Sequence, residues 1–322
     1  MDVLSEILSS VRAERAMTAR FGLTAPWGLA SRGVHSVLIR MSRGAPYWLK
    51  VEGYAPLHVK PGELVVLLPD VAHTISSEPD GEIVPFMQVF EKSSIKFVGE
   101  PIVIDHGNGG DATDLFCVLL WLPTYCRNTV LGVLPPFVHV RESDRSIDSS
   151  LTTTMQSLVV ESFAQRPGWQ LSAVRLGELL LVNILSEHFA KEEAKGEGWL
   201  RGLVDPQIVR ALSCIHKEPE RDWTVDALAN EAAMSRSRFS ARFKELMGVT
   251  PFTYVSNRRM LRAALLIETG VRSVKQLAQA TGYDSEKSFI RVFSQWCGVT
   301  PSVYMRRNYP HGSGGPDSLS KQ

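Results

Sequence analysis

Two stretches that begin fifty residues apart decide the fold of the C-terminal third of the chain. Residues 235–254 have the sequence SRSRFSARFKELMGVTPFTY, and residues 285–304 have the sequence SEKSFIRVFSQWCGVTPSVY. Both stretches share the first serine, two phenylalanines, the block GVTP and the final tyrosine at the same spacing. Chance does not produce agreement at so many spaced positions, so the sequence predicts a repeated structural unit.

Each copy is typical of a helix, a turn and a second helix. In the first copy, Thr224 is expected to cap a short helix and Ser235 the helix after it. In the second copy, Ser273 and Ser285 take these positions, and Gly282 supplies the positive φ of the turn between the helices. The pattern therefore predicts two helix-turn-helix motifs in tandem.

The second helix of each copy has an apolar and a polar face. Phenylalanines spaced four residues apart must face inward. The opposite face then carries small, polar and basic side chains, as insertion into a DNA major groove requires. These are Arg236, Ser237, Ser240, Ala241 and Lys244 in the first copy, and Glu286, Lys287, Ile290 and Arg291 in the second. The alternative is that any of these arginines is ordinary solvated helix surface.

A continuous helix is expected between the copies. Pro251 stands where a helix begins and Gly270 where one ends, and the nineteen residues from Pro251 to Thr269 predict a rod about 28 Å long. Successive major-groove faces of B-DNA lie about 34 Å apart, so the rod could hold the two helix-turn-helix motifs on one side of a duplex. We call these two motifs the reading heads. Arg258, Arg259 and Arg262 on this helix are expected to be solvated surface or to form internal salt bridges, rather than to contact phosphate.

The rest of the chain predicts an α+β protein with more than one domain. Residues 20–145 contain short apolar segments separated by Gly, Pro and Asp, which favours a β-sandwich or small barrel. Helical periodicity replaces this pattern from residue 146, and residues 191–198 form the best linker candidate. The expected domains are 1–145, a β-rich domain; 146–204, a helical connector; 205–310, the tandem helix-turn-helix domain; and 311–322, a disordered tail.

Charge and cysteine content restrict the class further. Residues 205–310 hold 16 Lys and Arg against 10 Asp and Glu, whereas residues 1–204 hold 18 against 23. Unless this asymmetry is chance, the C-terminal part meets a polyanion. The chain has no apolar run of membrane-spanning length and does not begin like a signal peptide. Its four cysteines form no CxxC pair, so a cytoplasmic location is expected.

At these residues the chain resembles the AraC/XylS family of transcription regulators. The resemblance covers about residues 205–308 and includes Gly282-Tyr283, Gly298, Pro301 and Tyr304. Ala233 departs from the glycine that the family often has at the first turn, which predicts a strained turn there. The resemblance implies the following DNA-binding residues: Arg236, Ser237, Arg238, Ser240, Ala241 and Lys244, followed by Glu286, Lys287, Ser288, Ile290 and Arg291.

The N-terminal half is similar to the cupin-like effector domain found fused to such regulators. The features that match are Ala25-Pro26-Trp27-Gly28 and Pro61-Gly62-Glu63-Leu64, with His73 after them. This resemblance implies a small-molecule pocket at the barrel mouth, with Trp27, Trp48 and His73 as candidate lining residues. The alternative is that both tryptophans belong to the core.

An enzyme is the competing interpretation. Metal-binding cupins usually place two histidines one residue apart, with a carboxylate and a third histidine later. Here the histidines are scattered without an HxH or ExxH pattern, so no metal, cofactor or catalytic residue is expected; they are His35, His58, His73 and His106. A metal-dependent cupin enzyme fused to a DNA-binding domain remains the alternative.

The expected function is therefore an effector-controlled, sequence-specific DNA-binding regulator with promoter DNA as its partner. The expected effector is a small molecule or an oxidant. An oxidant would act on the thiols of Cys117 and Cys126, although inert packing is the commoner role of buried cysteine. Residues 149–192 could pair two chains or cover their own sheet. A homodimer is expected, with RNA polymerase as a further partner of an activator. A third possibility is a plain DNA-binding protein whose N-terminal half only dimerises.

Overall fold

The structure is a computed structural model that divides into two compact units, which are described separately: residues 5–198, and residues 199–322 with residues 1–4. The parts of the chain that it describes are residues 8, 11–92, 100–123, 126, 131–141, 149–195, 202 and 205–308.

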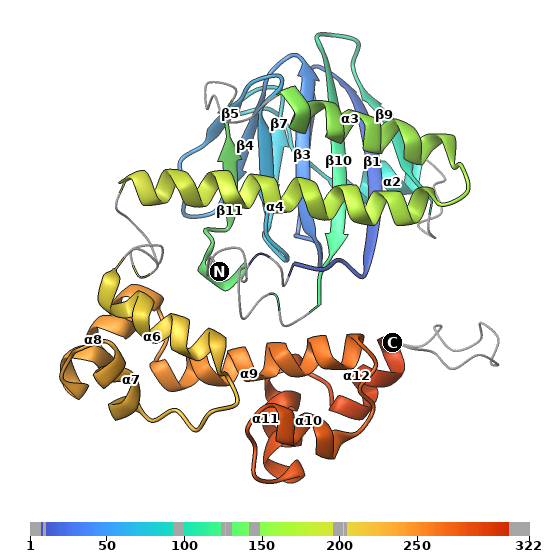
Figure 1. Cartoon of the computed structure of the whole chain (residues 1–322). Coiled ribbons are helices and arrows are strands. Elements are labelled where there is room, and N and C mark those ends of the chain that lie inside the picture. Colours follow the sequence, from blue (N-terminus) through green and yellow to red (C-terminus); the bar gives the residue numbers. More distant parts are fainter. Residues whose placement is uncertain are drawn as a thin grey trace. The chain divides into compact units, whose positions relative to one another are not determined.

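The first unit is built on two β-sheets (Figure 1). The six-stranded sheet has the order β11-β6-β3-β10-β1-β9, with β1 Arg15–Thr24, β3 Val37–Gly44, β6 Leu64–Leu67, β9 Ile102–Gly107, β10 Ala112–Trp121 and β11 Phe137–Val140. The five-stranded sheet has the order β5-β4-β7-β2-β8, with β2 Gly28–Ser31, β4 Tyr47–Val51, β5 Leu57–Val59, β7 His73–Ser76 and β8 Val84–Pro85. The short helices α2 Phe86–Lys92 and η2 Leu131–Val133 complete the unit's β-rich part.

Alternation along β1 shows how the sequence divides the two faces of the larger sheet. Ala19, Phe21 and Leu23 are buried in the apolar core that both sheets share. Thr18, one residue out of phase, hydrogen-bonds instead to Ser162 of a helix, with 2.5 Å between the two hydroxyl oxygens. Successive side chains of a strand point to opposite faces, so β1 has one face on the core and the other on the helix, and the two sheets confirm the β-rich half of the predicted α+β fold.

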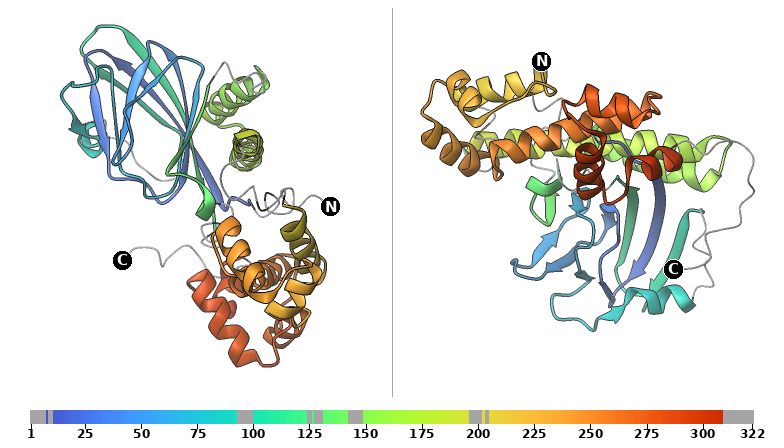
Figure 2. Two further views of the ribbon diagram at one scale, coloured as in Figure 1. Left: turned by 90° about the vertical axis from the view of Figure 1, so that its left-hand side faces the viewer. Right: turned by 90° about the horizontal axis from the view of Figure 1, so that it is seen from below.

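Two long helices, α3 Ser149–Ala164 and α4 Trp169–Lys195, cover the outer face of the six-stranded sheet (Figure 2). The contact is close at Gly177, where an added Cβ would lie 2.6 Å from Leu120 Cδ2 of β10. The helical segment therefore covers the sheet of its own unit, which is one of the two roles expected for it. No helix in the described ranges is long and apolar enough to cross a membrane.

Over residues 205–308 the second unit is all-helical, and α9 Pro251–Glu268 runs through it (Figure 1). The other helices are α6 Pro206–Lys217, α7 Val225–Glu231, α8 Arg236–Met247, α10 Val274–Ala280, α11 Glu286–Cys297 and α12 Pro301–Asn308. Thr224, Ser273 and Ser285 accept backbone N–H bonds at the starts of α7, α10 and α11, as predicted. Ser235 also occupies an N-cap position but makes no side-chain cap bond, so that part of the prediction was wrong.

Candidate nucleic-acid interface and internal cavity

The first candidate reading head consists of α7 and α8. Phe239 and Phe243 are fully buried against the core formed by α6, α7 and α9, so α8 turns its opposite face to solvent. Along that face Ser240 is half-buried, and the exposed residues are Arg236, Ser237, Arg238, Ala241 and Lys244. All six residues predicted for this head therefore lie on α8 and reach its surface to some degree.

One of these arginines already has a partner. Arg236 Nη1 lies 3.2 Å from Asp226 Oδ2 of α7, and both side chains are more than half exposed. An ion pair between exposed groups contributes only about 0–1 kcal/mol. A DNA phosphate or base edge could therefore displace Asp226 at small cost.

The turn before α8 is strained, as its sequence predicted. Ala233 has φ +53°, in the left-handed region that disfavours residues with a Cβ. Two side chains of α6 hold this turn by donating to its carbonyl groups. Gln207 donates to the carbonyls of Ala232 and Ala233, and Arg210 donates to that of Ala232 over 3.1 Å.

The second head repeats this plan with α10 and α11. Phe289 and Phe293 are fully buried, and the turn residue is Gly282 with φ +73°. Ile290 is half-buried, so its methyl groups are only partly available to a thymine. The remaining predicted residues of this head are exposed; they are Glu286, Lys287, Ser288 and Arg291.

Arg259 of α9 joins the loop before the first head to the turn of the second head, and we call it and the carbonyls it contacts the Arg259 cluster. Its guanidinium donates to the carbonyls of Pro219 (2.8 Å) and Arg221 (2.9 Å) in the α6–α7 loop, and to that of Gly282 (3.1 Å) in the second turn. The same charge lies 5.4 Å from the ring centre of Tyr283. We expected solvent exposure or an internal salt bridge for this arginine, and it bonds instead to backbone carbonyls of its own unit.

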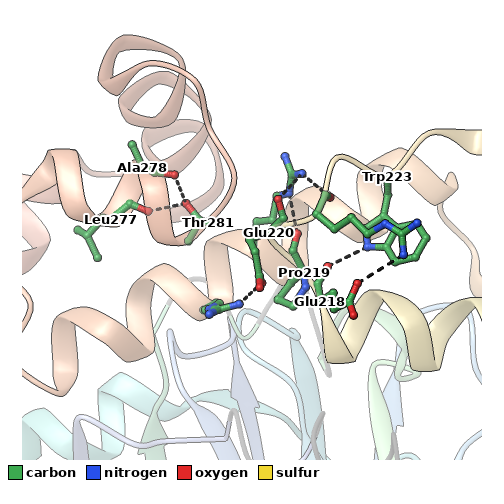
Figure 3. A network of polar contacts seen from close by, with 10 residues as sticks. Glu218, Pro219, Glu220, Trp223, Leu277, Ala278 and Thr281 are labelled. Atoms are coloured by element: carbon green, nitrogen blue, oxygen red, sulfur yellow. Dashed lines mark hydrogen bonds and ion pairs between the residues drawn. The ribbon is translucent and has the colours of Figure 1, made fainter. Parts of the chain in front are cut away.

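Figure 3 shows the loop side of this cluster. Trp223 Nε1 donates to the carbonyl of Glu218 over 2.8 Å, and the Glu220 carboxylate forms an ion pair with Arg262 of α9. On the second head, the buried Thr281 hydroxyl donates to the Leu277 carbonyl over 2.7 Å. Loop, connecting helix and second turn are therefore joined by directed bonds at several points.

A cavity of about 540 Å³ opens in the first unit. Most of its wall is apolar and comes from β1, β3, β10 and α2, including Phe21, Leu38, Phe86, Phe90, Leu119 and Trp121. This volume is in the range that encloses a drug-sized ligand.

Only one of the three residues predicted to line a pocket lies at this cavity. His73 belongs to its wall. Trp27 is 4% exposed and packs beside Tyr47 in the core, as the alternative interpretation had it. Trp48 lies one residue out of phase with the inward-facing Tyr47 and Leu49, and it stacks on His58 with 4.6 Å between ring centres.

The wall of the cavity also contains an unexpected buried cation, Arg40 of β3, which is 3% exposed. Its Nη2 approaches His73 Nε2 at 3.5 Å, and His73 Nδ1 lies 3.0 Å from the Val71 carbonyl oxygen. Burial, together with the charge of Arg40, lowers the pKa of His73 to about 4. His73 is therefore neutral at pH 7, with Nδ1 donating to Val71 and Nε2 free to accept.

The histidines considered for a metal site point to different partners. His35 pairs with Asp70, His58 stacks on Trp48, and His73 lies beside Arg40. Within the described ranges, no three His, Cys, Asp or Glu side chains come together as metal ligands would. The four cysteines are free thiols, and burial raises the pKa of Cys117.

Arg40 and the Arg259 cluster were not predicted as functional features. Arg40 lies in VLIRM, an apolar stretch that is buried on both faces of its strand. Because a one-residue change of register reverses the faces, only strand pairing reveals that Arg40 points into the cavity. A signal was nevertheless present, since a charged residue inside an otherwise apolar strand needs an explanation.

Comparison with known proteins shows similarity along both units. Residues 2–190 match the family described as Cupin, and residues 228–307 match the family described as Helix-turn-helix domain. The chain is 28% identical over 312 residues to a Streptomyces lividans protein named as an AraC-like transcription regulator, covering 95% of this chain and 98% of that one. It is 24% identical over 318 residues to the HTH-type transcriptional regulator AlkR of Acinetobacter baylyi, covering 96% and 100%.

Two solved structures are also similar. The DNA-binding domain of AdpA in complex with a target DNA is 30% identical and covers 34% of this chain and 99% of that chain, with a TM-score of 0.31. ToxT from Vibrio cholerae is 12% identical and covers 92% and 100%, with a TM-score of 0.35.

Proposed function

The chain belongs to the AraC-type transcriptional regulators, with a cupin domain ahead of its helix-turn-helix domain, and on that premise we propose that a small molecule bound in the internal cavity controls how α8 and α11 engage promoter DNA. The observation that carries this proposal is the cavity itself, which has a mostly apolar wall and one buried cation. A mature core is close-packed, so a space of about 540 Å³ inside it is most simply a ligand site.

On the DNA side, we assign base and phosphate contacts to the outward faces of the two recognition helices. Arg291 is the candidate for a bidentate contact with guanine, because it is exposed on α11 and no ion pair within the described part of the chain involves it. Arg236, Ser237, Arg238, Ser240, Ala241 and Lys244 would contact the first groove, and Glu286, Lys287, Ser288 and Ile290 would join Arg291 in the second.

The proposal includes a cytoplasmic homodimer that acts at promoters, with RNA polymerase as the further partner of an activator. Support for pairing comes from the helical layer, where Val160 of α3 and Leu171 and Leu179 of α4 are apolar and more than half exposed. Light scattering on the purified protein gives its mass. A monomer at micromolar concentration would remove this part of the proposal.

Two measurements test the function as a whole. A genome-wide map of bound sites, followed by binding to those sites at several salt concentrations, should show affinity that falls steeply with salt, because phosphate neutralisation releases counterions. Titration with small molecules should then change that affinity. Salt-insensitive binding, or the same DNA affinity in the presence of every cavity ligand found, would contradict effector-controlled regulation. Stoichiometric metal in the purified protein would favour the alternative of a cupin enzyme.

A further inference from the structure

Strand pairing places Arg40 among small side chains. Ala19, Cys117, Arg40 and Val65 stand opposite one another on β1, β10, β3 and β6. Residues directly opposite in antiparallel pairs share one face of the sheet, and here that is the inner face. Because Ala19 and Cys117 are short, space is left beside the guanidinium, and all three of Ala19, Cys117 and Arg40 belong to the cavity wall.

The positive charge of Arg40 has no counter-ion in the described part of the chain. Its Nη2 lies 3.5 Å from His73 Nε2, and the uncharged Cys117 and Tyr47 side chains are its other polar neighbours. Its Nε and Nη1 are buried without a geometrically formed hydrogen bond. The buried carboxylate of Glu63 does not serve it, because that group binds His139 Nε2 and the Lys60 amide, each over 2.9 Å. A buried charge without a partner is destabilising, which indicates that the partner is a molecule from outside.

The groups around the guanidinium are neutral at pH 7. Burial raises the pKa of the Cys117 thiol, and it raises the pKa of Tyr47 to about 12, although Arg40 opposes both shifts. His73, with its lowered pKa, is neutral too. None of the three can therefore supply the missing negative charge.

We propose that the effector is an apolar monocarboxylic acid whose carboxylate pairs with Arg40 while its alkyl or aryl body fills the cavity. This inference rests on the proposed effector control. A guanidinium presents a planar fork that matches the two oxygens of a carboxylate. One buried cation balances one negative charge, so a monocarboxylate fits better than a doubly charged phosphate monoester. The aromatic and aliphatic lining suits a hydrocarbon body.

The first test uses the full-length wild-type chain and needs no variant. Decanoate labelled with ¹³C at its carboxyl carbon is titrated with acid in the bound and free states, and NMR gives both pKa values. An apolar cavity alone would raise the pKa of the bound acid, whereas a paired guanidinium lowers it. We expect a bound pKa below the free value. A bound pKa above the free value would overturn the proposal.

The second test compares acids with neutral analogues of the same shape. Decanoate and 1-decanol form one pair and 2-naphthoate and 2-naphthol the other, with calorimetry as the assay. In at least one pair the acid should bind ten or more times more tightly than the alcohol. Arg40→Met should reduce this preference to less than twofold. Arg43→Met is the matched control, because Arg43 lies on the same strand but is exposed and bonds to Gln156, and it should keep the preference.

A stability readout separates ligand binding from a merely structural role. If Arg40 held the fold together, Arg40→Met would lower the melting temperature of the free protein. We expect the opposite, a higher melting temperature, because the change removes a buried charge that lacks a counter-ion. A lower melting temperature with an unchanged preference for acids would overturn the proposal.

The outcomes also separate this inference from the proposed function. If acid and alcohol bind equally and both alter DNA affinity, effector control stands and the carboxylate class is wrong. If the acids bind through Arg40 without altering DNA affinity, the site is right and its regulatory role is wrong. Failure of both acids to bind overturns the proposal directly.

Discussion

The strained turn at Ala233 offers a sharp test of the C-terminal unit. Its φ of +53° costs a residue with a Cβ roughly 1–2 kcal/mol. Ala233→Gly relieves that cost, while the greater freedom of glycine in the unfolded chain offsets about 0.4–1 kcal/mol of the gain. The side chain is exposed, so little packing is lost. The free energy of unfolding should therefore rise by about 0.5–1 kcal/mol.

Native-state hydrogen exchange of the full chain measures this locally. Peptides from α7 and α8 should exchange about two to five times more slowly in Ala233→Gly, since each 1.4 kcal/mol is a factor of ten. Gly282→Ala is the matched control at the equivalent turn. It introduces a Cβ at φ +73°, against the carbonyl oxygen of Glu220. The free energy of local opening of α10 and α11 should therefore fall by about 2 kcal/mol or more, and their peptides should exchange faster.

Equal or faster exchange in Ala233→Gly would refute the reasoning, because it would show that the bonds from α6 make the left-handed conformation free of cost. A Gly282→Ala variant as stable as the wild type would be equally damaging. In that case the φ angle would not determine the stability of either turn.

Three further predictions concern the rest of the molecule. Arg259→Met removes a guanidinium that joins the α6–α7 loop, just before the first head, to the turn of the second head, so the unfolding free energy should fall by about 2–3 kcal/mol. Footprints should change from two protected groove segments to one, and retention of both segments would contradict a rigid pair of heads. The pKa of His73 is near 4 when folded and 6.5 when unfolded, so between these values the unfolded chain binds the extra proton. Stability in urea should accordingly decrease as the pH falls from about 6.5 to about 4, by up to about 3 kcal/mol, and His73→Gln should flatten that part of the profile. Arg291→Ala should weaken specific DNA binding about 1–3 kcal/mol more than random binding, and equal losses would reassign Arg291 to a phosphate.

The sequence predicted the C-terminal unit in detail because local chemistry determines it. A repeat at a fixed offset, the caps Thr224 and Ser285, and the pairs of phenylalanines all act over a few residues. The departure at Ala233 was also visible, since only its neighbours in the turn decide its φ angle. Ser235 shows the limit, because the residue type marks the cap position but does not orient the hydroxyl.

The cavity could not be predicted in the same way because it depends on strand register. Trp27 and Trp48 are large aromatic residues near the expected barrel mouth, yet one is in the core and the other stacks on the outward-facing His58. Arg40 lies inside only because it stands opposite Cys117 and Val65 on neighbouring strands. Such pairings join residues far apart in sequence, and no local pattern determines them.

The Arg259 cluster has a consequence for the DNA itself. With α6–α7 loop, connecting helix and second turn bonded to one side chain, the heads have little freedom to adjust to a duplex. If both heads contact one duplex, as we propose, any difference between their separation and the pitch of B-DNA must be absorbed by bending or twisting of the duplex. The energy of that deformation depends on the base-pair steps between the two contacted segments. Sequence there should influence affinity although no side chain reaches it, with flexible steps such as TA favoured over stiff A-tracts.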